Sequence, residues 1–265
     1  MKYITTGFKG SKRKLLSTIL DLTLEVEDAE TFYDGFCGSG IVSAHMRHNG
    51  FEVFASDKMP SSALYAKVFL NGFDQEVVKS EITRLNSIPA KKGWLYKHYS
   101  GNHLRKVRGQ TSPQWRPRAF KGFNASTLDA IFDDIHSMPD SNEKNALLFS
   151  ALVAMNKVFN GTNDQKSSLA NWTTAAHKPV ELVMPTNIKG IVGTVENCNI
   201  FDSKNTEADV VYLDPPYTTG VLYDACYHLN DSVVLWDKPQ VDTSYALPRP
   251  DRVCFKKNAK CAGSF

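Results

Sequence analysis

Residues 31–57 carry the pattern that most restricts how this chain can fold. A short apolar segment, residues 31–34, leads into a glycine-containing loop and then into an apolar-periodic run from Ile41 to His48. Asn49-Gly50 ends this run, and residues 51–57 return to a strand-like pattern. A helix that joins two strands in this way is typical of parallel sheets. We therefore expect an α/β fold built on a parallel sheet.

The same alternation continues along the chain, with one long interruption. The further predicted elements are helices over residues 12–25, 61–70, 125–137 and 143–159, and strands over residues 191–195 and 209–213. Ser11 is a candidate N-cap of the first helix. We predict one α/β domain formed by residues 1–74 and 186–265, which holds an inserted, mainly helical lobe of residues 75–185.

The second restricting feature is the tetrapeptide Asp214-Pro215-Pro216-Tyr217, which follows the apolar run Val210–Leu213. Two consecutive prolines cannot continue a sheet ladder or enter a helix interior, so the strand must stop there. A carboxylate, a free carbonyl group and an aromatic ring are left at its carboxyl end. Ligands of open α/β sheets bind at these ends, and the tetrapeptide therefore predicts a ligand site.

The loop Gly38-Ser39-Gly40 predicts a second part of that site. Glycines between a strand and a helix let the backbone approach a ligand closely, and the helix amino end favours anionic or polar groups. A dinucleotide-binding loop would carry a third glycine at the position of Ser43, which argues against a nicotinamide or flavin cofactor. Asp57 closes the next strand, where a carboxylate can accept hydrogen bonds from ribose hydroxyls; as an alternative, it is a helix-capping or surface acid.

Residues 91–121 are strongly basic. They contain nine Lys or Arg and no Asp or Glu, and four Trp or Tyr are interleaved with them. A solvated basic loop is one interpretation, and a nucleic-acid surface is the other, since cations neutralise phosphates and aromatic rings stack on bases. The candidate contacts are Arg105, Lys106, Arg108, Arg116 and Arg118. Phosphate contacts, which carry no sequence information directly, are the commoner use of such side chains.

Composition sets only broad limits on the class of protein. The chain has 265 residues, of which 42% are hydrophobic, and a net charge of +3. No pair of cysteines has C-x-x-C spacing, so we expect no metal site, and the scattered cysteines suit free thiols in a reducing cytoplasm. The sequence shows neither a membrane-spanning apolar stretch nor a signal-peptide pattern, and we expect no membrane partner.

Three motifs in this order resemble those of the Dam-like class of adenine-specific DNA methyltransferases. They are Lys9-Gly10-Ser11-Lys12, then residues 34–40 with the pattern D-x-F-x-G-x-G, and last Asp214-Pro215-Pro216-Tyr217. The resemblance extends over essentially the whole chain. It implies a Rossmann-like methyltransferase with an inserted target-recognition lobe, S-adenosylmethionine as cofactor, and double-stranded DNA as partner, as in restriction-modification systems.

The resemblance also implies residue roles. The residues expected to bind the cofactor are Lys9, Ser11, Asp34, Phe36, Gly38, Gly40 and Asp57, with Asn199 after the third strand and Asp202 as its alternative. Asp214 and the Pro215 carbonyl would accept hydrogen bonds from the adenine amino group, and Tyr217 would stack on the flipped base. Such acceptors would localise the amino lone pair for attack on the methyl group, mainly through positioning and electrostatics.

The segment after Tyr217 departs from this resemblance. Only 48 residues follow, which is short for the further strands that the family implies beside the catalytic one. An unpaired apolar strand Val210–Leu213 would expose a hydrophobic edge. We therefore expect an incomplete sheet, and three explanations stay open: a truncated or degenerate copy, completion by a second polypeptide, or a shortened working enzyme.

Other functions remain as alternatives. Cytosine amino-methylases usually carry Ser in place of Asp214, and protein-glutamine methylases usually carry Asn, so Asp214 favours adenine. A DNA-binding protein that has lost catalysis would keep the basic segment and lose cofactor binding. A nicotinamide oxidoreductase is disfavoured by Ser43 and by the proline tetrapeptide.

Overall fold

The computed structural model describes residues 7–105, 112, 114–162, 165, 168–204, 207–216 and 223–241. The chain divides into two compact units. Unit 1 comprises Met1–Leu85, Met138–Val153 and Leu182–Tyr217, and unit 2 comprises Asn86–Ser137, Ala154–Glu181 and Thr218–Phe265.

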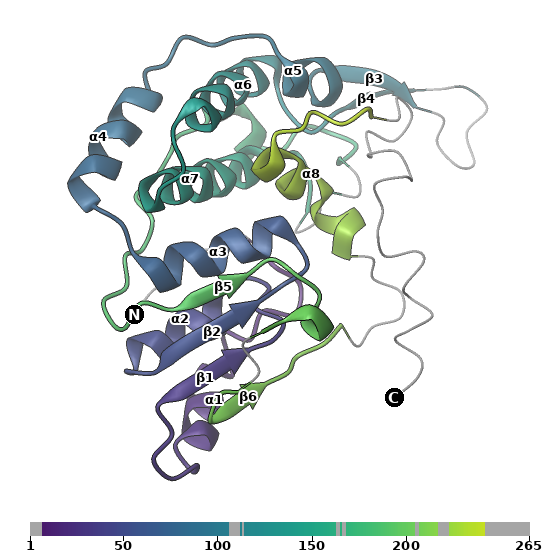
Figure 1. Cartoon of the computed structure of the whole chain (residues 1–265). Coiled ribbons are helices and arrows are strands. Elements are labelled where there is room, and N and C mark those ends of the chain that lie inside the picture. Colours follow the sequence, from purple (N-terminus) through teal and green to yellow (C-terminus); the bar gives the residue numbers. More distant parts are fainter. Residues whose placement is uncertain are drawn as a thin grey trace. The chain divides into compact units, whose positions relative to one another are not determined.

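Unit 1 contains a four-stranded parallel sheet with the order β5-β2-β1-β6 (Figure 1). Its strands are β1 (Thr31–Asp34), β2 (Glu52–Ser56), β5 (Thr194–Glu196) and β6 (Val210–Tyr212). β1 pairs with both β2 and β6, and β2 pairs with β5 on its other side. The predicted α/β class and parallel sheet are confirmed, and β6 lies at one end of the sheet.

The α-helices described in unit 1 are α1 (Leu16–Thr23), α2 (Ile41–His48), α3 (Pro60–Asn71), α4 (Gln75–Leu85) and the first part of α7 (Asn142–Val158). α2 joins β1 to β2, as its sequence pattern predicts. The core of the unit is aromatic where α3 meets α7, because Tyr65 and Phe69 both pack edge-on against Phe149 at ring-centroid distances of 5.5 and 5.4 Å. These rings are fully buried, so burial of apolar area stabilises this contact.

Arg47 on α2 is a buried cation that is held by backbone carbonyl groups. Its guanidinium donates to the oxygens of Phe69, Gly190 and Ile191 at 2.6, 3.1 and 2.9 Å. Burial lowers the pKa of Arg47 from its usual value. The side chain thereby fastens the segment that enters β5 to α2 and to the end of α3.

This arrangement explains one wrong sequence prediction. We expected a strand over residues 191–195, but β5 begins at Thr194, and Ile191 and Val192 are 51% and 62% exposed. The carbonyl groups of residues 190 and 191 accept from Arg47 instead of from a sheet partner. Ser11 is likewise not the N-cap of the first helix, since α1 begins at Leu16 after a turn over residues 12–15.

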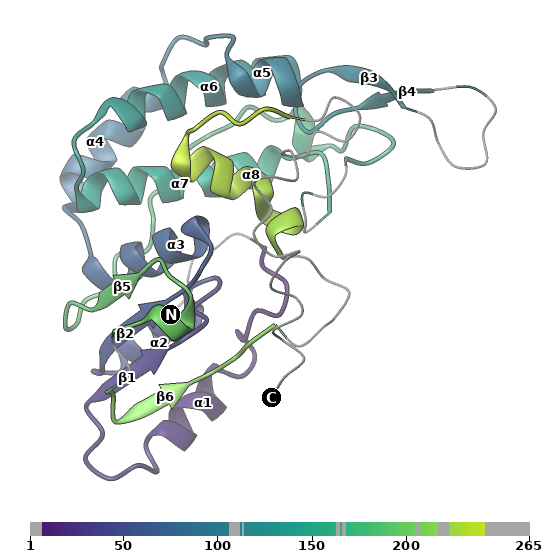
Figure 2. The ribbon, with the colours of Figure 1, turned by 45° about the vertical axis from the view of Figure 1, so that its right-hand side comes forward.

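Unit 2 is mainly helical and carries one antiparallel hairpin (Figure 2). Its elements are α5 (Trp94–Tyr99), β3 (Asn102–Arg105), β4 (Gln114–Pro117), α6 (Gly122–Ser137), the end of α7, a 3₁₀ turn at Ala175–His177 and α8 (Tyr223–Leu235). Sequence periodicity predicts α6 and α7 to within three residues at each end, but it does not predict α5, the hairpin or α8.

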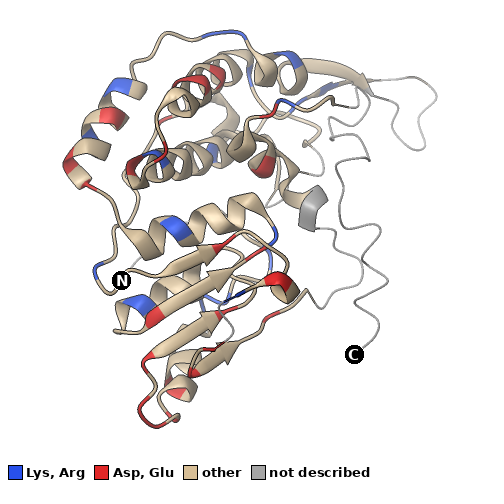
Figure 3. Ribbon diagram, in the orientation of Figure 1, with Lys and Arg blue, Asp and Glu red and all other residues tan. Residues whose placement is uncertain are grey.

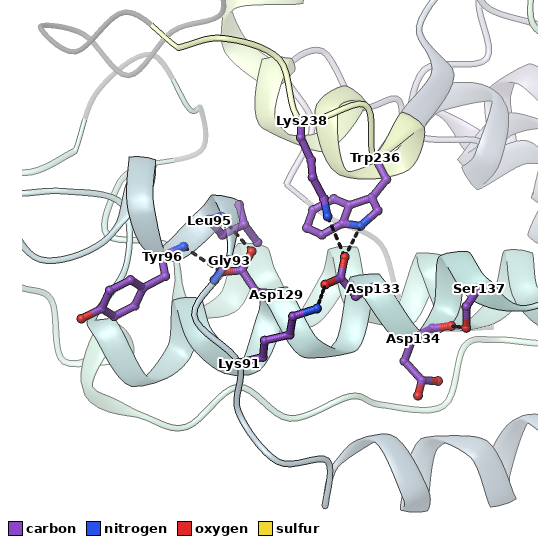
Figure 4. A network of polar contacts seen from close by, with 10 residues as sticks. All are labelled: Lys91, Gly93, Leu95, Tyr96, Asp129, Asp133, Asp134, Ser137, Trp236 and Lys238. Carbon is purple, nitrogen blue, oxygen red and sulfur yellow. Dashed lines mark hydrogen bonds and ion pairs between the residues drawn. The ribbon is translucent and has the colours of Figure 1, made fainter.

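Two aspartates on α6 organise unit 2 (Figure 4). Asp129 accepts hydrogen bonds from the backbone N–H groups of Gly93, Leu95 and Tyr96 at 2.8 Å each, and so caps the start of α5. Asp133 binds the ammonium groups of Lys91 and Lys238 and the indole N–H of Trp236. These donors hold the pKa of Asp133 down, at about 2, against the opposing effect of its burial. Segments distant in sequence thus converge on one helix face.

Candidate active site

The three sequence motifs meet at one edge of the sheet in unit 1. Strand register places Asp34 opposite Ala55 of β2 and Tyr212 of β6, so the residues that follow each strand lie at the same edge. The glycine loop is bonded to both neighbours: Gly35 N–H donates to the Tyr212 carbonyl group and Cys37 N–H donates to that of Ser56, each at 3.1 Å.

The glycine loop requires glycine at two positions. Gly38 has a φ of +50°, and a Cβ atom there would lie 3.0 Å from the ring of Phe8. Gly40 has a φ of +69°, and a Cβ atom there would lie 3.1 Å from Phe69 and 3.2 Å from the backbone nitrogen of Ala66. Left-handed backbone is costly for other residues, so both glycines serve the close approach of this loop to its surroundings.

Asp57 braces the loop from the end of β2. Its Oδ2 accepts from Gly38 N–H at 2.9 Å and its Oδ1 accepts from Met59 N–H at 2.8 Å. Burial raises the pKa of Asp57 to about 6, although both amide bonds act in the opposite direction. The bond to Met59, the N-cap residue of α3, closes the turn that leads into this helix and does not cap the helix itself. Each carboxylate oxygen has a second lone pair, so these bonds leave acceptor capacity for a ligand hydroxyl.

Asp34, at the end of β1, is a buried carboxyl group with unused capacity. It is 1% exposed and its Oδ2 accepts from the Ser43 hydroxyl at 2.6 Å. Among the residues that the structure describes, Oδ1 has no hydrogen-bond partner. Burial raises the pKa of Asp34 to about 7, with a smaller contribution from the neighbouring Asp57 charge. A buried orphan acceptor beside a glycine loop fits a polar ligand that would supply the missing partner.

Asp214 lies two residues beyond β6 and forms an ion pair with Lys12. Lys12 Nζ binds Asp214 Oδ2 and also donates to the Gly10 carbonyl group at 2.9 Å. The two side chains are 17% and 24% exposed. Sequence reasoning overlooked Lys12, although it is the fourth residue of the quoted Lys9-Gly10-Ser11-Lys12 motif.

The other predicted cofactor and catalytic residues lie on the same segments. Lys9 and Phe36 are half-buried and Ser11 is exposed, with Ser11 N–H bonded to the Phe8 carbonyl group at 3.3 Å. Pro215 and Pro216 are exposed, and Tyr217 lies outside the described residues. The turn of residues 8–12 therefore contacts the glycine loop through Phe8 and Asp214 through Lys12.

The segment after β5 places an asparagine that sequence reasoning missed. Asn197 donates to the carbonyl groups of Asp57 and Lys58 at 2.8 and 3.1 Å and so ties the ends of β5 and β2 together. Asn199 caps the 3₁₀ turn Ile200–Asp202, because its Oδ1 accepts from Phe201 N–H at 3.3 Å. Asp202 and Phe201 are exposed.

The predicted DNA-contacting residues lie in unit 2. Lys106 and Arg108 fall outside the described residues, and Arg105 is the last residue of β3. Arg116 on β4 is half-buried and donates to Gln114 at 3.0 Å, whereas Arg118 donates to the His98 carbonyl group at 2.6 Å. In the same hairpin Leu104 pairs with Trp115, and these side chains are 56% and 67% exposed.

Acidic side chains also gather before the amino end of β1 in unit 1. The loop between α1 and β1, which precedes the amino end of β1, is acidic, with Glu25, Glu27, Asp28 and Glu30 (Figure 3). Lys9 and Lys12 lie in the turn that reaches the carboxyl edge through Phe8 and Asp214. A polyanion would therefore be disfavoured near the amino edge.

Two kinds of feature are absent from the described part of the chain. No group of three or more His, Cys, Asp or Glu side chains is arranged to hold a metal ion there. None of the helices described is both long and apolar enough to cross a membrane.

Comparison with known proteins agrees with this geometry. The chain is 28% identical over 221 residues to the type II methyltransferase M.NlaIII of Neisseria lactamica, and this match covers 78% of the chain and 61% of that protein. It is 26% identical over 251 residues to the type II methyltransferase M.FokI of Planomicrobium okeanokoites, with 88% of the chain and 37% of that protein covered.

The chain thus spans about three-fifths and a little over a third of these two relatives' lengths. The family model for the D12 class N6 adenine-specific DNA methyltransferases matches residues 8–253, which include all three motifs. The chain belongs to the D12 class of N6 adenine-specific DNA methyltransferases.

Proposed function

We propose that this chain transfers a methyl group from S-adenosylmethionine to the exocyclic amino nitrogen of an adenine in a specific sequence of double-stranded DNA, as in restriction-modification systems. The observation that carries the proposal is the position of Asp214, which follows β6 at the same sheet edge as the glycine loop after β1. This edge brings a hydrogen-bond acceptor for an amino group next to a cradle for a cofactor.

The cofactor half of the site would use the residues around the glycine loop. Asp57 would accept from the ribose hydroxyls, and the orphan Oδ1 of Asp34 would meet a polar group of the cofactor. The remaining members of the cofactor set are Lys9, Ser11, Phe36, Gly38, Gly40 and Asn199, with Asp202 as the alternative to Asn199. When bound, the cofactor supplies an electrophilic methyl group on a sulfonium.

The base half would use Asp214, Pro215, Pro216 and Tyr217. The adenine amino nitrogen is a poor nucleophile because its lone pair is delocalised into the ring. Asp214 and the Pro215 carbonyl group would accept hydrogen bonds from its two N–H groups and localise that lone pair. The nitrogen then forms a bond to the methyl carbon, the carbon–sulfur bonding pair goes to sulfur, and one amino proton leaves to water. Positioning and electrostatics account for most of the rate.

The target base would have to leave the duplex, at a cost of a few kcal/mol, and Tyr217 would stack on it. The predicted recognition lobe of residues 75–185 would hold the DNA. Its basic candidates are Arg105, Lys106, Arg108, Arg116 and Arg118, and the exposed Trp115 adds an aromatic face. Arg118 would act mainly by bracing the hairpin, because its guanidinium already binds the His98 carbonyl group.

Asp214→Asn tests the catalytic assignment. We expect single-turnover transfer of labelled methyl groups to duplex DNA to fall by roughly 100-fold or more, with cofactor affinity changed by less than about threefold. Glu207→Gln, an exposed acid nearby in sequence, is the matched control and should keep full activity. Digestion of the product should yield N6-methyladenine. Methylated cytosine, methylated protein or no transfer would each contradict the proposal.

A second candidate function follows from β6. In the part of the chain that the structure describes, β1 is the sheet partner of β6, and Val211 and Leu213 are 47% and 55% exposed. An open strand of this kind accepts further strands. The alternative proposal is a degenerate methyltransferase that binds DNA, or that transfers methyl groups only when a second polypeptide adds strands to β6. Robust methyl transfer by the isolated monomer in a sedimentation-checked preparation would contradict it.

A further inference from the structure

The ion pair between Lys12 and Asp214 places a cation on the acid that is proposed to handle the adenine amino group. Lys12 Nζ binds Asp214 Oδ2, and the same ammonium donates to the Gly10 carbonyl group at 2.9 Å. Both side chains are mostly buried, at 17% and 24% exposure, so water screens the pair less than it screens surface charges. The Asp214 carboxylate and the Gly10 carbonyl group therefore both restrict the position of the lysine.

A carboxylate that accepts hydrogen bonds from an amino group has two oxygens, with about four acceptor positions in all. A cation on Oδ2 takes one of these positions and restricts the rotation of the carboxylate, so that Oδ1 is the oxygen best placed to accept from the base. Charge-assisted hydrogen bonds are roughly twice as strong as neutral ones.

We infer that Lys12 is a positioning residue for the methyl-transfer step, which holds the Asp214 carboxylate turned so that one oxygen accepts a hydrogen bond from the adenine amino group. This inference rests on the proposed function. Lys12 does not touch the reacting atoms: the amino nitrogen forms the bond to the methyl carbon, the sulfur receives the carbon–sulfur pair, and the amino proton goes to water.

The position of the lysine adds a link between the two halves of the site. Phe8, four residues before Lys12, lies against Gly38 of the glycine loop, where a Cβ atom would be 3.0 Å from its ring. The turn of residues 8–12 thus contacts the cofactor loop at one end and Asp214 at the other. Lys12 therefore sets the position of Asp214 with respect to the loop that would hold the methyl donor.

The first experiment compares Lys12→Met with Lys12→Arg and with the control Lys14→Met in the full chain. Lys14 is an exposed lysine of the same segment, so its substitution makes the same change in charge. We expect Lys12→Met to lower the single-turnover rate of methyl transfer by roughly 30- to 100-fold, while cofactor and DNA affinities change by less than about threefold. Lys12→Arg should recover part of the rate, and Lys14→Met should match the unchanged chain.

A double-mutant cycle separates positioning from a structural role. In the Asp214→Asn background, Lys12→Met should lower the transfer rate further by less than about threefold, because the lysine has lost the group through which it acts. The inference would be overturned if the rate losses of the two single variants multiplied in the double variant. It would also be overturned if Lys12→Met lowered cofactor affinity and transfer rate by the same factor. If Lys12→Met does not fold, as judged by its thermal transition, Lys12→Gln takes its place in the cycle.

Failure of this inference can be told from failure of the proposed function. An active unchanged chain with an equally active Lys12→Met variant overturns the inference alone. An unchanged chain that transfers no methyl group to adenine, either by itself or with an added partner chain, overturns the proposed function and this inference with it.

Discussion

The β1–β2 side and the β6 side of one sheet edge in unit 1 are held in place by different interactions. On the β1–β2 side, Asp34 and Asp57 are fixed by buried packing and by short bonds to nearby backbone and hydroxyl groups. On the β6 side, the strand is only three residues long and half exposed. There, polar contacts from distant segments substitute for burial: Asp209 holds the start of β6 and Lys12 holds Asp214.

This difference matches the two tasks that are proposed for the edge. A site that holds the same cofactor in every cycle gains from rigidity. A site that admits a base after it leaves a duplex gains from contacts that can be made and broken. The following predictions test whether the two sides differ in this way.

The largest effect is expected at Gly40. Its φ of +69° and the 3.1–3.2 Å approach to Phe69 and Ala66 leave no room for a methyl group. We expect Gly40→Ala to lower the free energy of unfolding by about 2–4 kcal/mol, through left-handed strain and overpacking. Chemical denaturation measures this change. Gly50→Ala, which adds only left-handed strain at an open turn, is the control and should cost less.

The next effect concerns Arg47, which fastens the start of β5. Replacement by Met should cost about 2–3 kcal/mol of unfolding free energy, since three backbone carbonyl groups lose their donor. Amide exchange should accelerate in residues 190–196 more than in β6. Equal acceleration in both strands would show that the two sides of the sheet are not independent.

A third prediction uses pH. Burial raises the pKa of Asp34 to about 7 in the folded chain, from an ordinary value near 3.8, so the folded state binds more protons between these values. The contribution of Asp34 to the free energy of unfolding should therefore be complete below about pH 4. It should be lost as the pH rises towards 7.

Asp34→Asn should remove part of this slope, and the variant should gain on the order of 2 kcal/mol relative to the unchanged chain at pH 8. Thermal unfolding at pH 5 and pH 8 measures the difference. Some slope should remain, because the pKa of Asp57 is also raised by burial, to about 6. A variant that is destabilised more at pH 8 than at pH 5 would contradict the assignment.

The smallest effect is expected at Asp209, which is exposed. Its Oδ2 accepts from Glu30 N–H, Thr31 N–H and the Thr31 hydroxyl at 3.0, 2.8 and 2.6 Å. Asp209→Ala should speed amide exchange in Val210–Tyr212 several-fold and leave β2 unchanged. Exchange that is unchanged in β6 would show that pairing with β1 alone fixes this strand.

Sequence patterns predict some elements better than others. β1 and α2 have the predicted bounds, because a short apolar strand, a glycine loop and an amphipathic helix are local signals. β5 was misplaced, because Arg47 removes two carbonyl groups from the sheet and no local pattern reports this. The hairpin and α5 lie in the basic segment, residues 91–121. Frequent Lys and Arg residues there interrupt the apolar periodicity by which a helix or strand is predicted.

The site was predicted to the extent that its residues share motifs. Asp34, Asp57 and Asp214 do lie at one sheet edge, as strand ends imply. The pairing of Lys12 with Asp214 joins two segments that lie far apart in the sequence, and a single sequence contains no signal for such a contact. The bond by which Asp57 braces the glycine loop could not be predicted either, because it depends on the position of the Gly38 amide in the folded chain.

The pairing of β6 with β1 also bears on how the chain is made. The bond between Thr31 and Asp209 joins residues that are 178 positions apart. Synthesis at 5–20 residues per second would leave β1 without this neighbour for roughly 10 to 40 seconds. During that interval β1 and β2 can pair with each other, while the edge of β1 that later pairs with β6 stays unpaired. We expect a nascent chain arrested before residue 209 to be a better chaperone substrate than one arrested after it.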